Sequence, residues 1–177
     1  MKNDKLIITI NREYGSGGRE IAQKLGNLLD LKVYDKMALE KIEKQYGLEE
    51  ENPRDAYAVQ KKILHNIAAK ESCIIVGRTG FHIFKNNKHV LRILLIADFD
   101  ARVKHISEKY NISELAAKRR IKEVDREREE YTLANAGVSR YDARNYDFVL
   151  NVTNIPAYHV AFFLAQNARM KFFNKEH

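Results

Sequence analysis

The sequence predicts an α/β protein whose parallel sheet is covered by helices on both faces. Short apolar runs rich in Ile, Val and Leu alternate along the chain with longer amphipathic segments. Strands buried on both faces have this continuous apolar character, and parallel neighbours need helical connections. The first apolar run also leads into three glycines within four residues and then into a helical pattern. Such a strand, loop and helix can bind an anion, because backbone N–H groups and the helix N-terminus converge there.

The composition is that of a soluble globular protein with one domain. Of 177 residues, 45% are hydrophobic and 31% are charged. No apolar run approaches the roughly 20 residues needed to span a bilayer, so no membrane association is expected. The single cysteine, Cys73, lies in an apolar run and is expected to be buried. Because neither a disulfide nor a signal-peptide pattern is visible, we expect a cytoplasmic protein.

Hydrophobic periodicity and turn residues give the expected order of elements. Strands are expected at residues 7–10, 31–35, 72–76, 89–97 and 146–152. Helices are expected from the glycines to residue 29 and at 36–45, 53–70, 81–85, 99–110, 114–131 and 156–173, with Ser113 as an N-cap. Residues 46–52 are predicted to form a turn, and residues 132–145 an irregular polar segment.

The glycine loop departs from the usual phosphate-binding pattern, G-x-x-x-x-G-K-[ST], because it has no lysine. If Gly17 is the last motif glycine, Gly18 takes the lysine position and Glu20 falls near the hydroxyl position. If Gly18 is the last glycine, Arg19 replaces the lysine. In both registers another residue replaces the first motif glycine, Arg12 or Glu13 respectively. A plain strand-to-helix turn that uses glycine for tight geometry is the alternative.

Polar residues follow three of the predicted strands. Arg12 and the glycine loop come after the first strand, Asp35 after the second and Arg78 after the third. Because the carboxyl ends of parallel strands meet at one edge of a sheet, these residues are expected to lie close together in a ligand site.

With these motifs in place, the chain resembles the cytidylate kinase-like family, a branch of the P-loop nucleoside monophosphate kinases. The resemblance is carried by ITINREYGSGGREI at residues 8–21, YDK at 34–36, VGR at 76–78, IKEVDRER at 121–128, and YD at 146–147 with Asn151. Cytidylate kinases proper have Asp-Gly-Arg where this chain has Val-Gly-Arg. The similarity extends from about Lys5 to Asn167.

The resemblance implies a three-layer P-loop NTPase fold with a five-stranded parallel sheet of order 2-3-1-4-5. Residues 1–177 would then form one domain, with residues 36–70 as a helical insert on the acceptor side and about 119–145 as a helical lid. The implied reaction transfers the terminal phosphoryl group of ATP to a nucleoside monophosphate, with Mg²⁺. Such transfer depends mainly on positioning and positive charge.

The resemblance also implies roles for individual residues. The cofactor, ATP with Mg²⁺, would be bound by Arg12, Gly15, Ser16, Gly17, Gly18, Arg19 and Glu20, where the carboxylate of Glu20 could bind the metal or repel the phosphates. The charge of the missing lysine would come from Arg19, while Arg126 and Arg128 would close over the transferring phosphoryl group. The acceptor would be bound by Asp35, Arg78 and Asp125, and Asp125 could instead orient the lid arginines.

Simpler roles remain open for several of these residues. Arg126 and Arg128 lie in a run of alternating charge, which is usually a solvated helix face. Asp35 is also a suitable cap for the helix that follows it. The six histidines show no metal-ligand spacing, so no protein metal site is expected.

Two further functions compete with the kinase. A nucleotide-binding protein without catalysis is the second hypothesis, because the loop lacks its lysine. A nucleic-acid binder is the third and weakest, resting on the net charge of +7 and on Lys118-Arg119-Arg120. The acceptor is not identified by the sequence. Residues 36–71 carry no readable motif and are short for a full monophosphate-binding insert, which argues against a free cytidine nucleotide.

Overall fold

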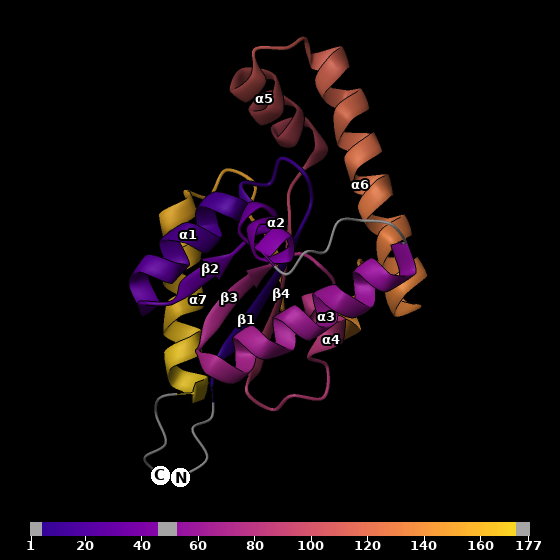
Figure 1. Ribbon diagram of the computed structural model, residues 1–177. Coiled ribbons are helices and arrows are strands. Elements are labelled where there is room, and N and C mark those ends of the chain that lie inside the picture. The colour runs from indigo at the N-terminus through magenta and orange to yellow at the C-terminus, as the bar shows by residue number, and fades with distance from the viewer. Residues whose placement is uncertain (1–4, 46–52, 173–177) are drawn as a thin grey trace.

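In the computed structural model, which describes residues 5–45 and 53–172, five parallel strands form one sheet between two sets of helices (Figure 1). The strands are β1 (Ile7–Arg12), β2 (Lys32–Tyr34), β3 (Cys73–Val76), β4 (Val90–Ile96) and β5 (Phe148–Asn151). Their order is β2-β3-β1-β4-β5, and every neighbouring pair is parallel. This confirms the predicted fold class and strand order.

The helices are α1 (Gly18–Leu29), α2 (Lys36–Gln45), α3 (Pro53–Lys70), α4 (Gly80–Ile83), α5 (Phe99–Tyr110), α6 (Glu114–Ala136) and α7 (Ala157–Phe172), with a 3₁₀ turn at Ala143–Asn145. Side chains alternate across each strand, so β1 supplies apolar residues to two cores. Ile8 and Ile10 pack with residues of α1 and α7 on one face, and Ile7 packs with α2 and α3 on the other. Cys73 is buried in the second core, as predicted.

Helices α5 and α6 form a hairpin that projects beyond the end of the sheet (Figure 1). Its small core consists of Val103, Ile106, Ala117 and Ile121. Ser113 caps α6, as predicted, and its hydroxyl accepts a hydrogen bond from the Ala116 N–H at 3.2 Å. The hairpin therefore brings the first part of α6 against α5 and leaves its second half over the sheet edge.

Helix α6 is longer than the sequence pattern predicts, because it continues to Ala136 instead of ending near Tyr131. Thr132 and Asn135 are weak helix formers, yet their side chains bond back to carbonyls one turn earlier, at 2.7 and 2.8 Å. Gly137 then ends the helix in a left-handed conformation, with φ of 68°. The prediction of an irregular segment beginning at residue 132 is therefore wrong for its first five residues.

Other boundaries differ by a few residues. Strand β1 extends to Arg12, which pairs with Leu95 of β4. Strand β5 begins at Phe148, because Tyr146 ends the 3₁₀ turn. The turn predicted for residues 46–52 lies outside the described residues.

Within residues 5–45 and 53–172, the helices lack the combination of length and apolar character that crossing a membrane requires.

Candidate functional site

The glycine loop lies between the end of β1 and the start of α1. Gly15 and Gly17 have φ of 89° and 77°, in the left-handed region where side chains are strained. Helix α1 begins at Gly18, directly after Gly17. The first N–H groups of a helix have no partner within the helix, so they face the ligand side of the loop. The loop therefore has the geometry of an anion-binding strand-to-helix turn.

Arg12 and Gly18 together explain the missing lysine. A Cβ atom added to Gly18 would lie 2.8 Å from both Cβ and Cγ of Arg12. One of the two registers considered for the loop takes Gly17 as the last motif glycine. In that register Arg12 would stand at the first glycine of the motif and Gly18 at its lysine, so that the cation and the glycine would have exchanged places. The first side-chain atoms of Arg12 lie against Gly18.

The guanidinium of Arg12 extends from the glycine loop to the turn after β3. Its Nη1 atom lies 2.6 Å from the position that a Cβ on Gly77 would occupy. Gly77 has φ of 78°, and Arg78 and Thr79 after it are also left-handed. The φ of 78° favours glycine at position 77, and the missing side chain leaves room for the Arg12 guanidinium, which links the first strand-end motif to the third.

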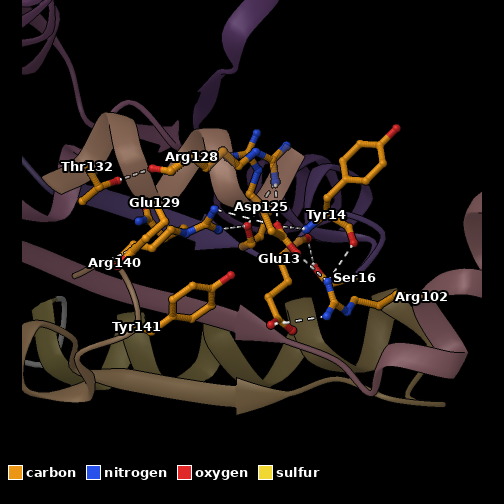
Figure 2. A network of polar contacts seen from close by, with 12 residues as sticks. Glu13, Tyr14, Ser16, Arg102, Asp125, Arg128, Glu129, Thr132, Arg140 and Tyr141 are labelled. Carbon is orange, nitrogen blue, oxygen red and sulfur yellow. Dashed lines mark hydrogen bonds and ion pairs between the residues drawn. The ribbon is translucent and has the colours of Figure 1, made fainter. Parts of the chain in front are cut away.

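Asp125 of α6 is bonded directly to the glycine loop (Figure 2). Its Oδ1 accepts a hydrogen bond from the Tyr14 N–H at 2.9 Å, and its Oδ2 accepts one from Arg102 Nη1 at 2.6 Å. Arg140 Nη1 lies 3.8 Å and Arg128 Nη1 4.0 Å from Oδ1. Asp125 therefore lies on the donor-loop side of the site and joins α5, α6 and the loop.

Arg102 of α5 is buried beside the glycine loop and binds its backbone through hydrogen bonds. It donates to the carbonyls of Ala97 and Tyr14, at 3.0 and 3.3 Å. Its Nη2 lies 3.6 Å from the carboxylate of Glu13, which in turn accepts from the Ala97 N–H at 2.9 Å. These contacts fix the loop backbone without using the glycine N–H groups.

A cavity of about 340 Å³ opens where the strand ends meet α6, and we call it the arginine cavity. It is lined by Asn11, Arg12, Lys36, Val76, Gly77, Arg78, Thr79, Val124, Glu127, Arg128, Tyr131, Thr132 and Arg140. Five of these side chains are cationic and one, Glu127, is anionic, which leaves a formal charge of +4. Charge of this density in a cleft indicates an anionic ligand.

The arginines in this cavity repel one another. Burial and the charges of Arg128, Arg140 and Arg78 lower the pKa of Arg12 to about 9, although Asp125 acts in the opposite direction. Burial and Arg140 likewise lower the pKa of Arg128 to about 10. A bound anion would relieve this repulsion, because an opposite charge favours the charged form of each group.

Arg128 and Arg140 lie against the end of β1. Both donate to the backbone carbonyl of Arg12, Arg128 at 3.2 Å. Arg140 is 1% exposed, and its Nε and Nη1 atoms have no hydrogen-bond partner in the described part of the chain. Buried guanidinium atoms without hydrogen bonds are costly, and the nearby carboxylate of Asp125 offsets part of that cost for Nη1.

Arg19 and Asp35 form an ion pair at the outer rim of the site. Arg19 Nε lies 2.9 Å from Asp35 Oδ2, and the arginine side chain is 61% exposed. Asp35 also caps α2, since its Oδ1 accepts from the Ala38 N–H at 3.0 Å. The two residues meet at the predicted sheet edge, but Arg19 is directed toward Asp35 and not along the loop.

A second cavity, the loop cavity of about 210 Å³, lies over the glycine loop. It shares Arg12 and Arg128 with the arginine cavity. A third cavity of about 210 Å³ shares Gly15, Gly17, Glu20 and His105 with the loop cavity and reaches the turn after β5. The three cavities follow one another along the glycine loop, and Ser16, which bonds to the Glu13 carbonyl at 2.9 Å, lines the third.

Arg126 is not among the lining residues of these cavities. Its side chain is 68% exposed and pairs with Glu130 one turn along the helix, at 3.7 Å. The structure therefore brings Arg12, Arg78, Arg128 and the glycine loop together and leaves Arg126 on the solvated face.

Arg102, Arg140 and Lys36 belong to the site but are not among the candidates chosen from the sequence. Arg140 lies in the segment predicted to be irregular, and Arg102 in an ordinary amphipathic helix. Arg102 and Arg140 do not belong to a local sequence motif, so only their packing against residues distant in the sequence identifies them. Among the described residues, no group of three or more His, Cys, Asp or Glu side chains is placed to hold a metal ion.

Known proteins support the same fold. The chain is 26% identical over 161 residues to a cytidylate kinase from Pyrococcus horikoshii, covering 86% of this chain and 83% of that protein. It superimposes on an uncharacterized protein from Eubacterium ventriosum with a TM-score of 0.83, at 25% identity, covering 93% of this chain and 98% of the other. A shikimate kinase from Bacteroides thetaiotaomicron shares the fold, with a TM-score of 0.60 at 12% identity over 93% and 96% of the two chains.

The sequence profile of one family matches most of the chain, at residues 7–58 and 51–154. The opening loop, the turn after β3 and helix α6 all fall within these matches. The protein belongs to the cytidylate kinase-like family.

Proposed function

We propose that this protein is a phosphotransferase that moves the terminal phosphoryl group of ATP to a nucleoside monophosphate or a related small acceptor. One observation carries the proposal: Arg12 and Arg128 line both the arginine cavity and the loop cavity. Two anionic groups, one in each cavity, would therefore meet between the same two guanidiniums. Phosphoryl transfer requires this arrangement of in-line positioning and positive charge.

The donor would lie along the glycine loop, with its phosphates on the N–H groups at the start of α1. Arg12 would supply the charge that the motif lysine usually gives, because its side chain crosses Gly18. Arg19 is a weaker candidate for that role, since it is exposed and paired with Asp35. The base of ATP would occupy the third cavity, beside the turn after β5.

Mg²⁺ supplies charge neutralisation on the phosphates of ATP when it is bound. This ion keeps several waters and often takes only one or two protein carboxylates. Glu20 lines the loop cavity, and its carboxylate pairs with Lys24 one turn along the helix, at 3.5 Å. Glu20 could therefore contribute to the ion, whereas Glu13 and Asp125 are held by Arg102.

The acceptor would bind in the arginine cavity. Arg78 lines this cavity, its side chain is 20% exposed, and its Nη2 lies 3.5 Å from Glu40. The buried Nε of Arg78 has no hydrogen-bond partner in the described chain. The acceptor's anionic group would pair with Arg78, and an oxygen of the acceptor would attack the terminal phosphorus of ATP as ADP leaves.

The alternative is a protein that binds nucleotide without turnover. The specific observation in its favour is Gly18 at the lysine position, because arginine is a planar fork and not a compact charge. Both functions predict that the protein binds ATP. Only the phosphotransferase predicts that ADP and a phosphorylated acceptor are formed.

The test combines a transfer assay with a binding assay. Purified protein is incubated with ATP, Mg²⁺ and each nucleoside monophosphate, and ADP is measured, while calorimetry follows ATP binding. We expect ADP formation that depends on an acceptor, and Arg12→Ala should lower kcat/KM for ATP about 100-fold, or roughly 2.7 kcal/mol. Arg144, which is 89% exposed, provides the control variant Arg144→Ala. Tight ATP binding without ADP from any acceptor would establish the alternative.

A further inference from the structure

The aromatic ring of Tyr14, in the glycine loop, contacts two arginines of α6. The Cζ atom of Arg128 lies 5.4 Å from the centre of the ring, and that of Arg120 lies 5.7 Å from it. At such distances a guanidinium is attracted to the electron-rich face of an aromatic ring. The two arginines differ in what else they reach. Arg128 lines both the arginine cavity and the loop cavity, whereas Arg120 is exposed and is not among the residues that line them.

The backbone of Tyr14 is held at both its N–H and its carbonyl group (Figure 2). The N–H donates to Asp125 Oδ1 at 2.9 Å, and the carbonyl accepts from Arg102 Nη1 at 3.3 Å. The next residue, Gly15, packs so closely on α5 that a Cβ atom added to it would lie 3.1 Å from both Arg102 Cβ and Ile106 Cγ1. The Tyr14 ring itself packs on the small core of the α5–α6 hairpin. Its position is therefore set by contacts within the protein.

The ring of Tyr14 is uncharged at neutral pH. Burial and a hydrogen bond between its hydroxyl group and that of Tyr110 raise the pKa of Tyr14 to about 12. An uncharged ring attracts a guanidinium without neutralising its charge, which a carboxylate partner would do. The ring can therefore hold Arg128 in place and leave its charge available to an anion.

The other contacts of the Arg128 guanidinium involve a single nitrogen. Nη1 donates to the Arg12 carbonyl at 3.2 Å and lies 4.0 Å from Asp125 Oδ1. Two contacts at one nitrogen do not by themselves fix the orientation of the guanidinium plane. The Tyr14 ring adds a contact at Cζ, away from that nitrogen. The Arg128 side chain is still 26% exposed, so a ligand in either cavity can reach it.

We propose that Tyr14 is a positioning residue for phosphoryl transfer, whose ring orients the Arg128 guanidinium between the two cavities. The proposal rests on the proposed function, in which Arg128 is one of the two cations that donor and acceptor share. A planar guanidinium binds phosphate oxygens through a fixed fork of N–H groups, so its orientation matters as well as its charge. Loss of the ring therefore slows transfer through Arg128.

The test is a double-mutant cycle on Tyr14 and Arg128, followed by ADP formation in the transfer assay. Tyr14→Leu should lower kcat/KM about tenfold, which corresponds to about 1.4 kcal/mol. In the Arg128→Ala background the same change should cost less than about threefold, because no guanidinium is left to orient. A larger loss in that background overturns the proposal, since Tyr14 would then contact a ligand or only support the loop. A loss below about threefold for Tyr14→Leu in the natural chain also overturns it.

Two matched variants separate the ring from its hydroxyl group and from its other arginine. Tyr14→Phe keeps the ring, so kcat/KM should stay within about threefold of the natural value. Arg120→Ala removes the other cation from the same ring and should change kcat/KM less than about twofold, because that side chain is exposed. A loss in Tyr14→Phe as large as that in Tyr14→Leu would assign the effect to the hydroxyl group and overturn the proposal.

Nuclear magnetic resonance of the arginine side chains separates a failure of positioning from a failure of catalysis. The Hε proton of Arg128, identified by its absence in Arg128→Ala, should be shifted by the ring in the natural chain and in Tyr14→Phe. In Tyr14→Leu it should return to the ordinary arginine position. If these shifts are seen and no ADP forms with any acceptor, phosphotransfer fails while the orientation of Arg128 by Tyr14 stands. An unchanged Arg128 signal in Tyr14→Leu overturns the proposal even if ADP is formed.

Discussion

The backbone N–H of Tyr14 donates a hydrogen bond to Asp125 Oδ1 at 2.9 Å, so a carboxylate of α6 is bonded directly to the glycine loop. The same carboxylate pairs with buried Arg102 at 2.6 Å. The glycine loop, helix α5 and the helix that carries Arg128 are therefore held together through Asp125. Changes at Asp125 should affect stability and nucleotide binding together.

Asp125→Ala should lower the free energy of unfolding by about 3 kcal/mol, because it leaves Arg102 buried without its closest carboxylate. Urea denaturation measures this change, and calorimetry should show weaker ATP binding in the same variant. Glu130→Ala on the same helix is the control. Its side chain is 68% exposed, so its effect should stay within about 0.5 kcal/mol. A loss below about 1 kcal/mol for Asp125→Ala would show that the pair contributes little.

Gly18→Lys, which restores the motif lysine, should destabilise the protein by about 1–3 kcal/mol because its Cβ meets Arg12. Arg12→Gly removes the obstacle, so the double variant should recover at least about 1 kcal/mol relative to additivity. Thermal or urea unfolding of all four proteins completes the cycle. A Gly18→Lys variant as stable as the natural chain would show that the two positions do not compete for space.

Arg128→Ala should lower kcat/KM about 100-fold, because Arg128 lines both cavities that would receive phosphates in the proposed reaction. Arg126→Ala, two residues earlier, should change it less than about twofold, since that side chain points to solvent. The transfer assay with ADP detection compares the two. Equal losses in both variants would mean that α6 rotates or bends during the reaction.

Asp147 should contribute to stability at neutral pH and lose that contribution in acid. Burial opposes its ionisation, but hydrogen bonds from Arg92 and the charge of Lys171 prevail, and the pKa of Asp147 lies below its ordinary 3.8. The unfolded chain therefore takes up a proton at higher pH than the folded chain, and stability falls as pH drops through the acid range.

Asp147→Asn should reduce this acid dependence and cost about 1 kcal/mol at pH 7. Denaturant unfolding between about pH 2 and 7 measures the slope for the variant and the natural chain. Glu108→Gln, at an exposed position on α5, serves as the control and should keep the natural slope. An unchanged slope in Asp147→Asn would assign the acid dependence to other carboxylates.

Local sequence patterns were sufficient to predict the layers and the sheet edge at which the candidate site lies. Continuous apolar runs predicted the strands, helical periodicity predicted the covering helices, and three glycines after the first strand located the loop. These features depend on local chemistry: side-chain period, glycine conformations and chain direction. For the same reason Arg12, at the end of the first strand, and Arg78, in the turn after the third, could be assigned to one edge of the sheet.

Which charges face that edge depends on packing between elements that are distant in the sequence. Arg126 and Arg128 are two residues apart, and two helical residues differ by about 200° in direction, so one faces the cavity and the other solvent. Arg102 and Arg140 come from segments far apart in the sequence and meet at Asp125. The lack of room for a side chain at Gly18 depends on Arg12, whose Cβ and Cγ lie 2.8 Å from the position that a Cβ on Gly18 would occupy. Such approaches are set by packing between elements, and no local sequence pattern encodes them.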